Sequence, residues 1–134
     1  MQHLSDPIPN NLILFWHDKK QIPPKIAQAV ENTVRVNCDA KIIYAEDVFM
    51  HTFIQEKYGA EVLALYKSCV IPASRSDIAR LMLLLEYGGV YMDAAMEAKL
   101  PITAVIDDHS EVILARRDDM KMENVLPQDM HVCN

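Results

Sequence analysis

Three polar side chains in the stretch from Ser74 to Ala98 have the types and spacing to bind a sugar diphosphate. Asp77 and Arg80 lie three residues apart in a helical pattern, and Asp93 follows a Gly-Gly pair and a short apolar run. Residues three apart on a helix share a face. An aspartate and an arginine together offer acceptors and donors to the hydroxyls of a sugar, and a further carboxylate can hold Mg²⁺ or Mn²⁺ against a diphosphate.

The same spacing is also compatible with purely structural roles. Asp77 and Arg80 could form an ordinary surface ion pair, which contributes only a few tenths of a kcal/mol to stability. Asp93 could cap a turn or a helix. The spacing of these residues alone therefore does not show where a binding site lies in the domain.

The elements around these residues alternate between strand and helix. Short apolar runs bounded by turn residues predict buried strands, and apolar residues at helical spacing predict helices. A loop is expected over residues 69–74, because the residue before Pro72 avoids the helical region. The expected strands are 11–16, 40–45, 90–94 and 111–116, and the expected helices are 24–37, 46–58, 60–67 and one capped by Ser74 or Ser76 that ends at Gly88. This order predicts an α/β fold with a mainly parallel sheet, in a single domain over residues 1–134.

Ligands of open α/β sheets bind beyond the carboxyl ends of the strands. Asp93 ends a predicted strand, so we expect it at that edge. The helix before it should run antiparallel to the sheet, with Asp77 and Arg80 near the edge as well. Its predicted core stripe consists of Ile78, Leu81, Met82 and Leu85.

Composition excludes several classes of protein. With 51% hydrophobic residues and 24% charged residues, the chain should be globular. A net charge of −6 argues against binding nucleic acid through its phosphates. No apolar run reaches the roughly 18 residues of a membrane span, and the first residues lack the apolar core of a signal peptide. Three widely spaced cysteines predict no disulfide and a cytoplasmic location, with a peripheral position at the inner membrane face as the alternative.

The block "SDIARLMLLLEYGGVYMDA" (residues 76–94) resembles the "SD-x-x-R…LL…YGG-V/I-Y/W-x-D" segment of glycosyltransferases that contain a DXD motif. That family includes capsular polysaccharide synthesis proteins and α-1,6-mannosyltransferases. The stretch "IPNNLILFWHDKKQIPPKI" is similar to the family's opening, so the resemblance covers residues 8–98.

The resemblance implies a Rossmann-like GT-A fold and assigns roles to individual residues. By resemblance, Trp16 packs on the nucleobase, and Asp77 and Arg80 contact the donor sugar. Asp93 is the first aspartate of the DXD motif and binds the donor together with Mn²⁺ or Mg²⁺. Where the second aspartate of that motif would stand, this chain has Ala95. The sequence Asp-Ala-x is closer to the capsular polysaccharide branch of the family.

The activity that the resemblance implies is transfer of a hexose from a UDP- or GDP-sugar to a glycan hydroxyl. The expected setting is bacterial capsular polysaccharide or lipopolysaccharide synthesis, and the expected transfer retains the anomeric configuration. No catalytic base is identifiable. Because the sequence stops soon after residues 111–116, we expect it to hold the donor-binding half, and to self-associate through an exposed apolar surface.

Two alternatives to this enzyme remain open. One is a non-catalytic, sugar-nucleotide-binding remnant, which Ala95 favours. The other is a nucleotide-binding α/β domain of unrelated function. Glu97 could supply a further metal ligand, or it could be a solvated loop residue.

Overall fold

Three parallel strands form the sheet in the part of the chain that the structure describes. The structure, a computed structural model, describes residues 7–104 and residue 106. The strands are β1 (Asn11–Phe15), β2 (Lys41–Ala45) and β3 (Val90–Tyr91), in the order β2-β1-β3. Leu12 of β1 pairs with Ile42 on one side and with Val90 on the other. The strand expected at 111–116 lies outside the described residues.

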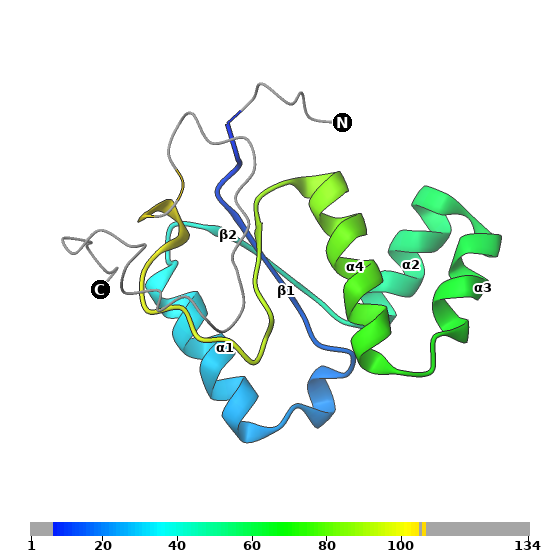
Figure 1. The fold of residues 1–134 in the computed structure, drawn as a ribbon, viewed down its shortest axis with the longest axis horizontal. Helices are drawn as coiled ribbons and strands as arrows, with labels where there is room; N and C mark the ends of the chain where they lie inside the picture. The colour runs from blue at the N-terminus through cyan, green and yellow to red at the C-terminus, as the bar shows by residue number, and fades with distance from the viewer. Residues whose placement is uncertain (1–6, 105, 107–134) are drawn as a thin grey trace, which may run out of the picture.

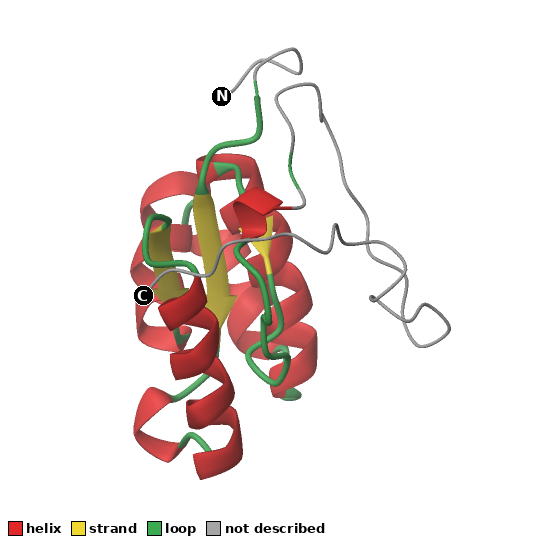
Figure 2. Ribbon diagram, turned by 90° about the vertical axis from the view of Figure 1, so that its left-hand side faces the viewer, coloured by secondary structure: helices red, strands yellow, loops and turns green. Residues whose placement is uncertain are grey.

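Within the described residues, four α-helices cover the two faces of the sheet (Figure 1). Helix α1 lies on one side of the strands, and the other three lie on the opposite side, as the view in Figure 2 confirms. None of the helices in the described part is long and apolar enough to cross a membrane. The helices are α1 (Pro24–Val36), α2 (Asp47–Tyr58), α3 (Ala60–Ser68) and α4 (Pro72–Tyr87), with short 3-10 turns η1 (Lys19–Gln21) and η2 (Ile102–Ala104). The predicted α/β fold with a parallel sheet is confirmed.

Strand β1 is the centre of the core because both of its faces are buried. Its side chains alternate between two apolar clusters, as the period of a strand requires. Ile13 and Phe15 pack with residues of α2, α3 and α4. Leu12 and Leu14 pack on the other face with Val30 of α1. All four are at most 4% exposed, which explains why β1 reads as a continuous apolar run.

Helix α4 begins earlier than the sequence suggested. Pro72 occupies its first turn, and Ile71 before it has extended backbone angles. A proline there loses no hydrogen bond, because the first helical N–H groups have no intrahelical partner. Ser74 therefore lies inside the helix rather than in a loop, and no side chain caps the helix. The predicted cap by Ser74 or Ser76 is wrong.

The buried stripe of α4 also differs from the predicted one. Ala79 and Leu83 are fully buried, and Ile78 and Met82 pack partly buried beside them. Leu81 and Leu85 are 70% and 58% exposed. The apolar stretch offers two helical stripes, and packing against β1 selects the one that contains the small Ala79. Leu81 and Leu85 were thus wrongly placed in the core.

Of the three cysteines, Cys38 and Cys69 lie in the described part of the chain. Cys38, which follows α1, is disulfide-bonded. Cys69, after α3, carries a free thiol. The expectation that the cysteines form no disulfide is therefore wrong for Cys38.

A Gly-Gly turn leads from α4 into β3. Gly88 and Gly89 have φ angles of 67° and 115°, a region that side chains disfavour. A Cβ on Gly89 would lie 2.7 Å from the Asn11 Cβ and closer still to its carbonyl oxygen. The Asn11 side chain in turn donates a hydrogen bond of 3.0 Å to the Tyr87 carbonyl. Gly89 therefore allows β3, and the aspartate after it, to lie against β1.

Replacing Gly89 with alanine should cost about 2 kcal/mol more than the same change at Gly59. Gly59 has a similar φ of 90° but open space around its Cα, so it controls for backbone strain. Urea denaturation of both variants measures the difference. Equal losses of stability at the two glycines would show that β3 is not held close to β1.

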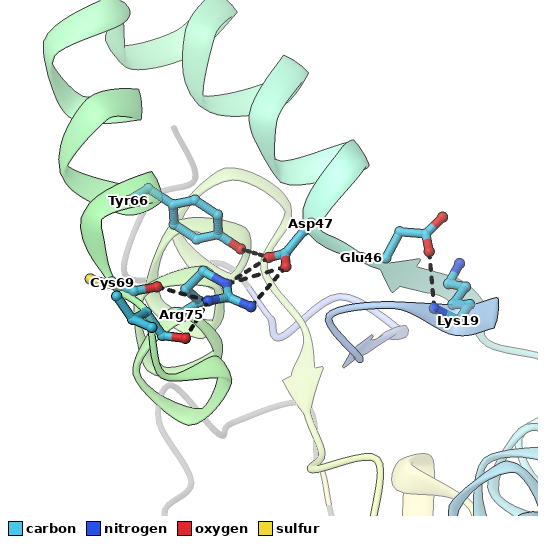
Figure 3. Close-up of polar contacts among 7 residues, drawn as sticks. Lys19, Glu46, Asp47, Tyr66, Cys69 and Arg75 are labelled. Atoms are coloured by element: carbon cyan, nitrogen blue, oxygen red, sulfur yellow. Dashed lines mark hydrogen bonds and ion pairs between the residues drawn. The ribbon is translucent and has the colours of Figure 1, made fainter. Parts of the chain in front are cut away.

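Tyr66 of α3 is the largest fully buried side chain among the described residues. Its hydroxyl donates a 2.7 Å hydrogen bond to Asp47 Oδ1 at the start of α2 (Figure 3). Burial raises the pKa of Tyr66 far above its ordinary value of 10.0, and the hydrogen bond to Asp47 raises it further. The native protein therefore keeps this proton at a pH where the unfolded chain releases it.

This linkage predicts that stability falls as pH rises above 10, with Tyr66 contributing up to about 1.4 kcal/mol per pH unit. Tyr66→Phe should lower stability near neutral pH and flatten the alkaline slope. Urea denaturation at about pH 8 and about pH 11 tests this, with the exposed Tyr58→Phe as control. An unchanged slope in Tyr66→Phe would contradict it.

Candidate donor site

The carboxyl ends of all three strands meet at one edge of the sheet. Trp16 directly follows β1, Asp47 follows β2 by two residues, and Asp93 follows β3 by two. The Met92 N–H donates to the Ile13 carbonyl, which continues the pairing of β3 with β1 up to Asp93. The edge expected for a ligand is thus lined by side chains from each strand.

One guanidinium joins the two predicted carboxylates at this edge. Arg80 Nη2 lies 2.9 Å from Asp93 Oδ1 and 3.7 Å from Asp77 Oδ1. Asp77 and Arg80 project from the first half of α4, so the structure brings three of the four predicted site residues together. The Asp77, Asp93 and Arg80 side chains are 72%, 53% and 38% exposed, respectively. The carboxylates are therefore open to a ligand while one cation holds them together.

The Tyr91 ring packs against Arg80 of this charged cluster. The Arg80 guanidinium lies over the Tyr91 ring, 4.7 Å from its centroid, an arrangement that favours the cation electrostatically. The Tyr91 hydroxyl lies 3.0 Å from Ser76 Oγ. Burial raises the pKa of Tyr91, so the phenol stays neutral at ordinary pH. Sequence reasoning assigned no role to Tyr91, although the residue belongs to the matched motif.

Arg80 keeps an unused hydrogen-bond donor. Its Nε is buried and has no hydrogen-bond partner in the described structure. Buried donors in native proteins are nearly always satisfied, and a bound ligand is one means of satisfying this one. Because this nitrogen is buried, a sugar or phosphate that contacts the site as it stands would reach the exposed carboxylate oxygens of Asp77 and Asp93 first.

Trp16 lies apart from this cluster. It packs against the apolar cluster on the α1 side of the sheet, next to Leu14, whereas Asp77 and Arg80 come from the opposite side. Its ring lies 5.1 Å from that of His17, and its indole Nε1 is buried without a partner within residues 7–104. The structure therefore places Trp16 at the same edge but not with the three charged side chains.

The segment after Asp93 is held by two buried polar residues, Thr33 of α1 and Asn37 directly after it. Thr33 Oγ1 donates to the Met96 carbonyl at 3.4 Å and accepts from the Ala98 N–H at 2.9 Å. Asn37 Oδ1 accepts a 2.7 Å hydrogen bond from the Ile102 N–H. These long-range bonds fix the loop in which the incomplete DXD motif lies. No pattern in the sequence pointed to them.

The residues present supply one carboxylate for a divalent cation. Ala94 is buried and Ala95 is exposed, so the position of the second DXD aspartate faces solvent but offers no oxygen. Within the described residues no group of three or more acidic, histidine or cysteine side chains is arranged to hold a metal. A magnesium ion needs only one or two carboxylates when donor phosphates and waters complete its shell. The site fits a metal that arrives with a diphosphate, rather than one bound beforehand.

Glu97, the alternative ligand, is engaged elsewhere. It accepts hydrogen bonds from Asn32 and Lys99, and its hydrogen bond with Lys99 is the main reason that its pKa lies below the ordinary value. It also lines a shallow polar depression that contains none of the predicted site residues. The lining consists of Asn32, Arg35, Val36, Glu97, Ala98 and Lys99.

Comparison with known proteins finds the family that the sequence motif indicates. A family model described as "Glycosyltransferase sugar-binding region containing DXD motif" matches residues 23–113. An uncharacterised glycosyltransferase of Acanthamoeba polyphaga mimivirus is 29% identical over 90 residues, which are 66% of this chain and 36% of the relative. The chain thus spans little more than a third of that relative's length.

Among solved structures, one that is similar to this chain is the PaToxG glycosyltransferase. It is 26% identical, with a TM-score of 0.46 over 67% of this chain and 43% of the other. The family model covers more than half of the present chain, and the matched residues 23–113 include the charged cluster at the carboxyl edge. This chain belongs to the family of glycosyltransferase sugar-binding regions that contain a DXD motif.

Proposed function

We propose that this chain binds a nucleoside-diphosphate sugar, with UDP or GDP as the nucleotide, and transfers its hexose to a glycan hydroxyl. The observation that carries the proposal is the bridge from Arg80 to Asp77 and Asp93 at the carboxyl edge. Family membership supports the reaction class. The proposed role in bacterial surface polysaccharide synthesis rests on the resemblance of Asp93 and Ala94 to the Asp-Ala-x sequence of the capsular polysaccharide branch. The proposed retention of configuration rests on the resemblance to the family as a whole.

The three side chains divide the work of donor binding by their chemistry. The carboxylates of Asp77 and Asp93 accept hydrogen bonds from sugar hydroxyls, and Arg80 donates only. Arg80 also keeps the two carboxylates from repelling each other before the donor arrives. Asp93 would hold the metal, which stabilises negative charge on the leaving diphosphate when it is bound.

A second candidate function is binding of a sugar nucleotide without transfer. Ala95 leaves the motif with one carboxylate, and the described residues contain no group of three or more acidic, histidine or cysteine side chains that could hold a metal. Donor hydrolysis separates the two functions. Hydrolysis that Asp93→Ala abolishes supports the enzyme, and donor binding without any hydrolysis supports the binding protein.

Removing any one charge of the cluster should weaken donor binding about tenfold or more. Isothermal titration with a UDP-sugar and a GDP-sugar, with and without Mn²⁺, measures the effect of Asp77→Asn, Arg80→Gln and Asp93→Asn. Stability should change by less than about 1 kcal/mol, because exposed ion pairs contribute little. Glu86→Gln removes an ion pair with Lys57 at the far end of α4 and serves as control. Wild-type affinity in all three site variants would refute the proposed site.

Restoring the second aspartate should strengthen metal-dependent binding. Because Ala95 is exposed, Ala95→Asp should fold normally and raise donor affinity in Mn²⁺ about tenfold, with no gain when the metal is chelated. Titration in Mn²⁺ and in EDTA measures this. Ala98→Asp adds the same charge later in the loop and is the matched control. An equal gain in both variants would attribute the effect to net charge instead.

A further inference from the structure

A carboxylate next to the donor site ties three helices together. Asp47 is the first residue of α2 and lies just beyond the carboxyl end of β2. Its carboxylate receives Arg75 Nε at 3.1 and 3.2 Å, Arg75 Nη2 at 3.0 Å and the Tyr66 hydroxyl at 2.7 Å. Figure 3 shows the Asp47 carboxylate between these two side chains. Helices α2, α3 and α4 therefore meet at one charged group.

Arg75 also donates hydrogen bonds to the loop before α4. Its Nη1 donates to the carbonyls of Cys69 and Val70 at 2.7 and 3.1 Å. These contacts matter because α4 has no capping side chain, with Ile71 at the capping position. Hydrogen bonds from an ionised donor are roughly twice as strong as neutral ones. Arg75 thus fixes the first turn of α4 where a cap would normally do so.

A second ion pair joins the same two helices and provides a comparison. Lys57 and Glu86 bridge α2 and α4 near their carboxyl ends, with side chains 47% and 35% exposed. The Arg75 and Asp47 side chains are 15% and 21% exposed. Water screens a charge pair less as the pair becomes buried, so the pair at the start of α4 should be the stronger constraint.

The residues that follow Arg75 are those of the donor site. Ser76 contacts the Tyr91 hydroxyl, and Asp77 and Arg80 lie within the next turn and a half. Because a helix is stiff, the orientation of its first turn sets the direction in which these side chains project.

We propose that the Asp47–Arg75 ion pair is a positioning element of the donor site, which orients the first turn of α4 so that Asp77 meets Arg80 and Asp93. This inference rests on the proposed donor-binding function. Neither residue needs to touch the donor, and both act through Asp77.

Arg75→Lys is the principal variant, because it keeps the charge and loses the two-pronged contact. Asp47→Asn, which keeps the shape and loses the charge, is the second, and Lys57→Gln is the matched control between the same helices. Hydrogen exchange should become about tenfold faster at the amides of Ser76 to Ile78 in the first two variants, and stay unchanged in β1 and in the control.

Donor titration in a double-mutant cycle shows whether the pair acts through Asp77. Arg75→Lys should weaken binding about tenfold when Asp77 is present, and less than about twofold in the Asp77→Ala background. A purely structural role predicts the same loss in both backgrounds and would overturn the inference. Unchanged exchange at the start of α4 would overturn it as well. If the wild-type chain binds no donor, the proposed function fails, while the exchange measurement still decides whether the pair positions α4.

Discussion

The arrangement of the site depends on the parallel pairing of β1 with both of its neighbours. β1 is buried on its two faces and hydrogen-bonded along its two edges. This pairing places the carboxyl ends of β2, β1 and β3 side by side, which a parallel sheet alone can do. The packing of Ala79 and Leu83 on the sheet then fixes α4 against it. Asp93 and Arg80, 13 residues apart, meet as a result.

Charge is organised in two layers at this edge. The outer layer is Asp77, Arg80 and Asp93, which is exposed and rests on the Tyr91 ring. The inner layer is Asp47 and Arg75, which is less exposed and bonded to the loop before α4. The outer groups have hydrogen-bonding capacity left for a ligand. The inner groups use theirs in contacts within the protein. A binding site works best when the groups that contact the ligand are held in place by supporting contacts of this kind.

Much of the fold was predictable because local signals agreed with tertiary packing. The apolar run of β1 and the prolines at the start of α1 mark the ends of elements through backbone chemistry alone, whereas Pro72, expected in a loop, begins α4. The meeting of Asp77, Arg80 and Asp93 followed from the rule for parallel sheets combined with the family motif. The roles of these residues remain predictions, as does the role of Trp16.

The parts that could not be predicted depend on long-range contacts. The pair of Asp47 and Arg75 spans 28 residues, and no local pattern indicates which of the many charged residues become partners. The exposed Leu81 fits a helical stripe as well as the buried Leu83 does, and only packing against β1 distinguishes them. Side chains along β1 point alternately to the two faces of the sheet, and this alternation continues to Trp16 and sets the face on which it packs.

The most direct measurement is a crystal structure of the chain with a UDP-sugar or GDP-sugar and Mn²⁺. The account predicts sugar hydroxyls within hydrogen-bond distance of Asp77, Arg80 and Asp93, with the metal between Asp93 and the diphosphate. A donor bound instead in the polar depression beside Glu97 and Lys99, with the Arg80 bridge untouched, would contradict it.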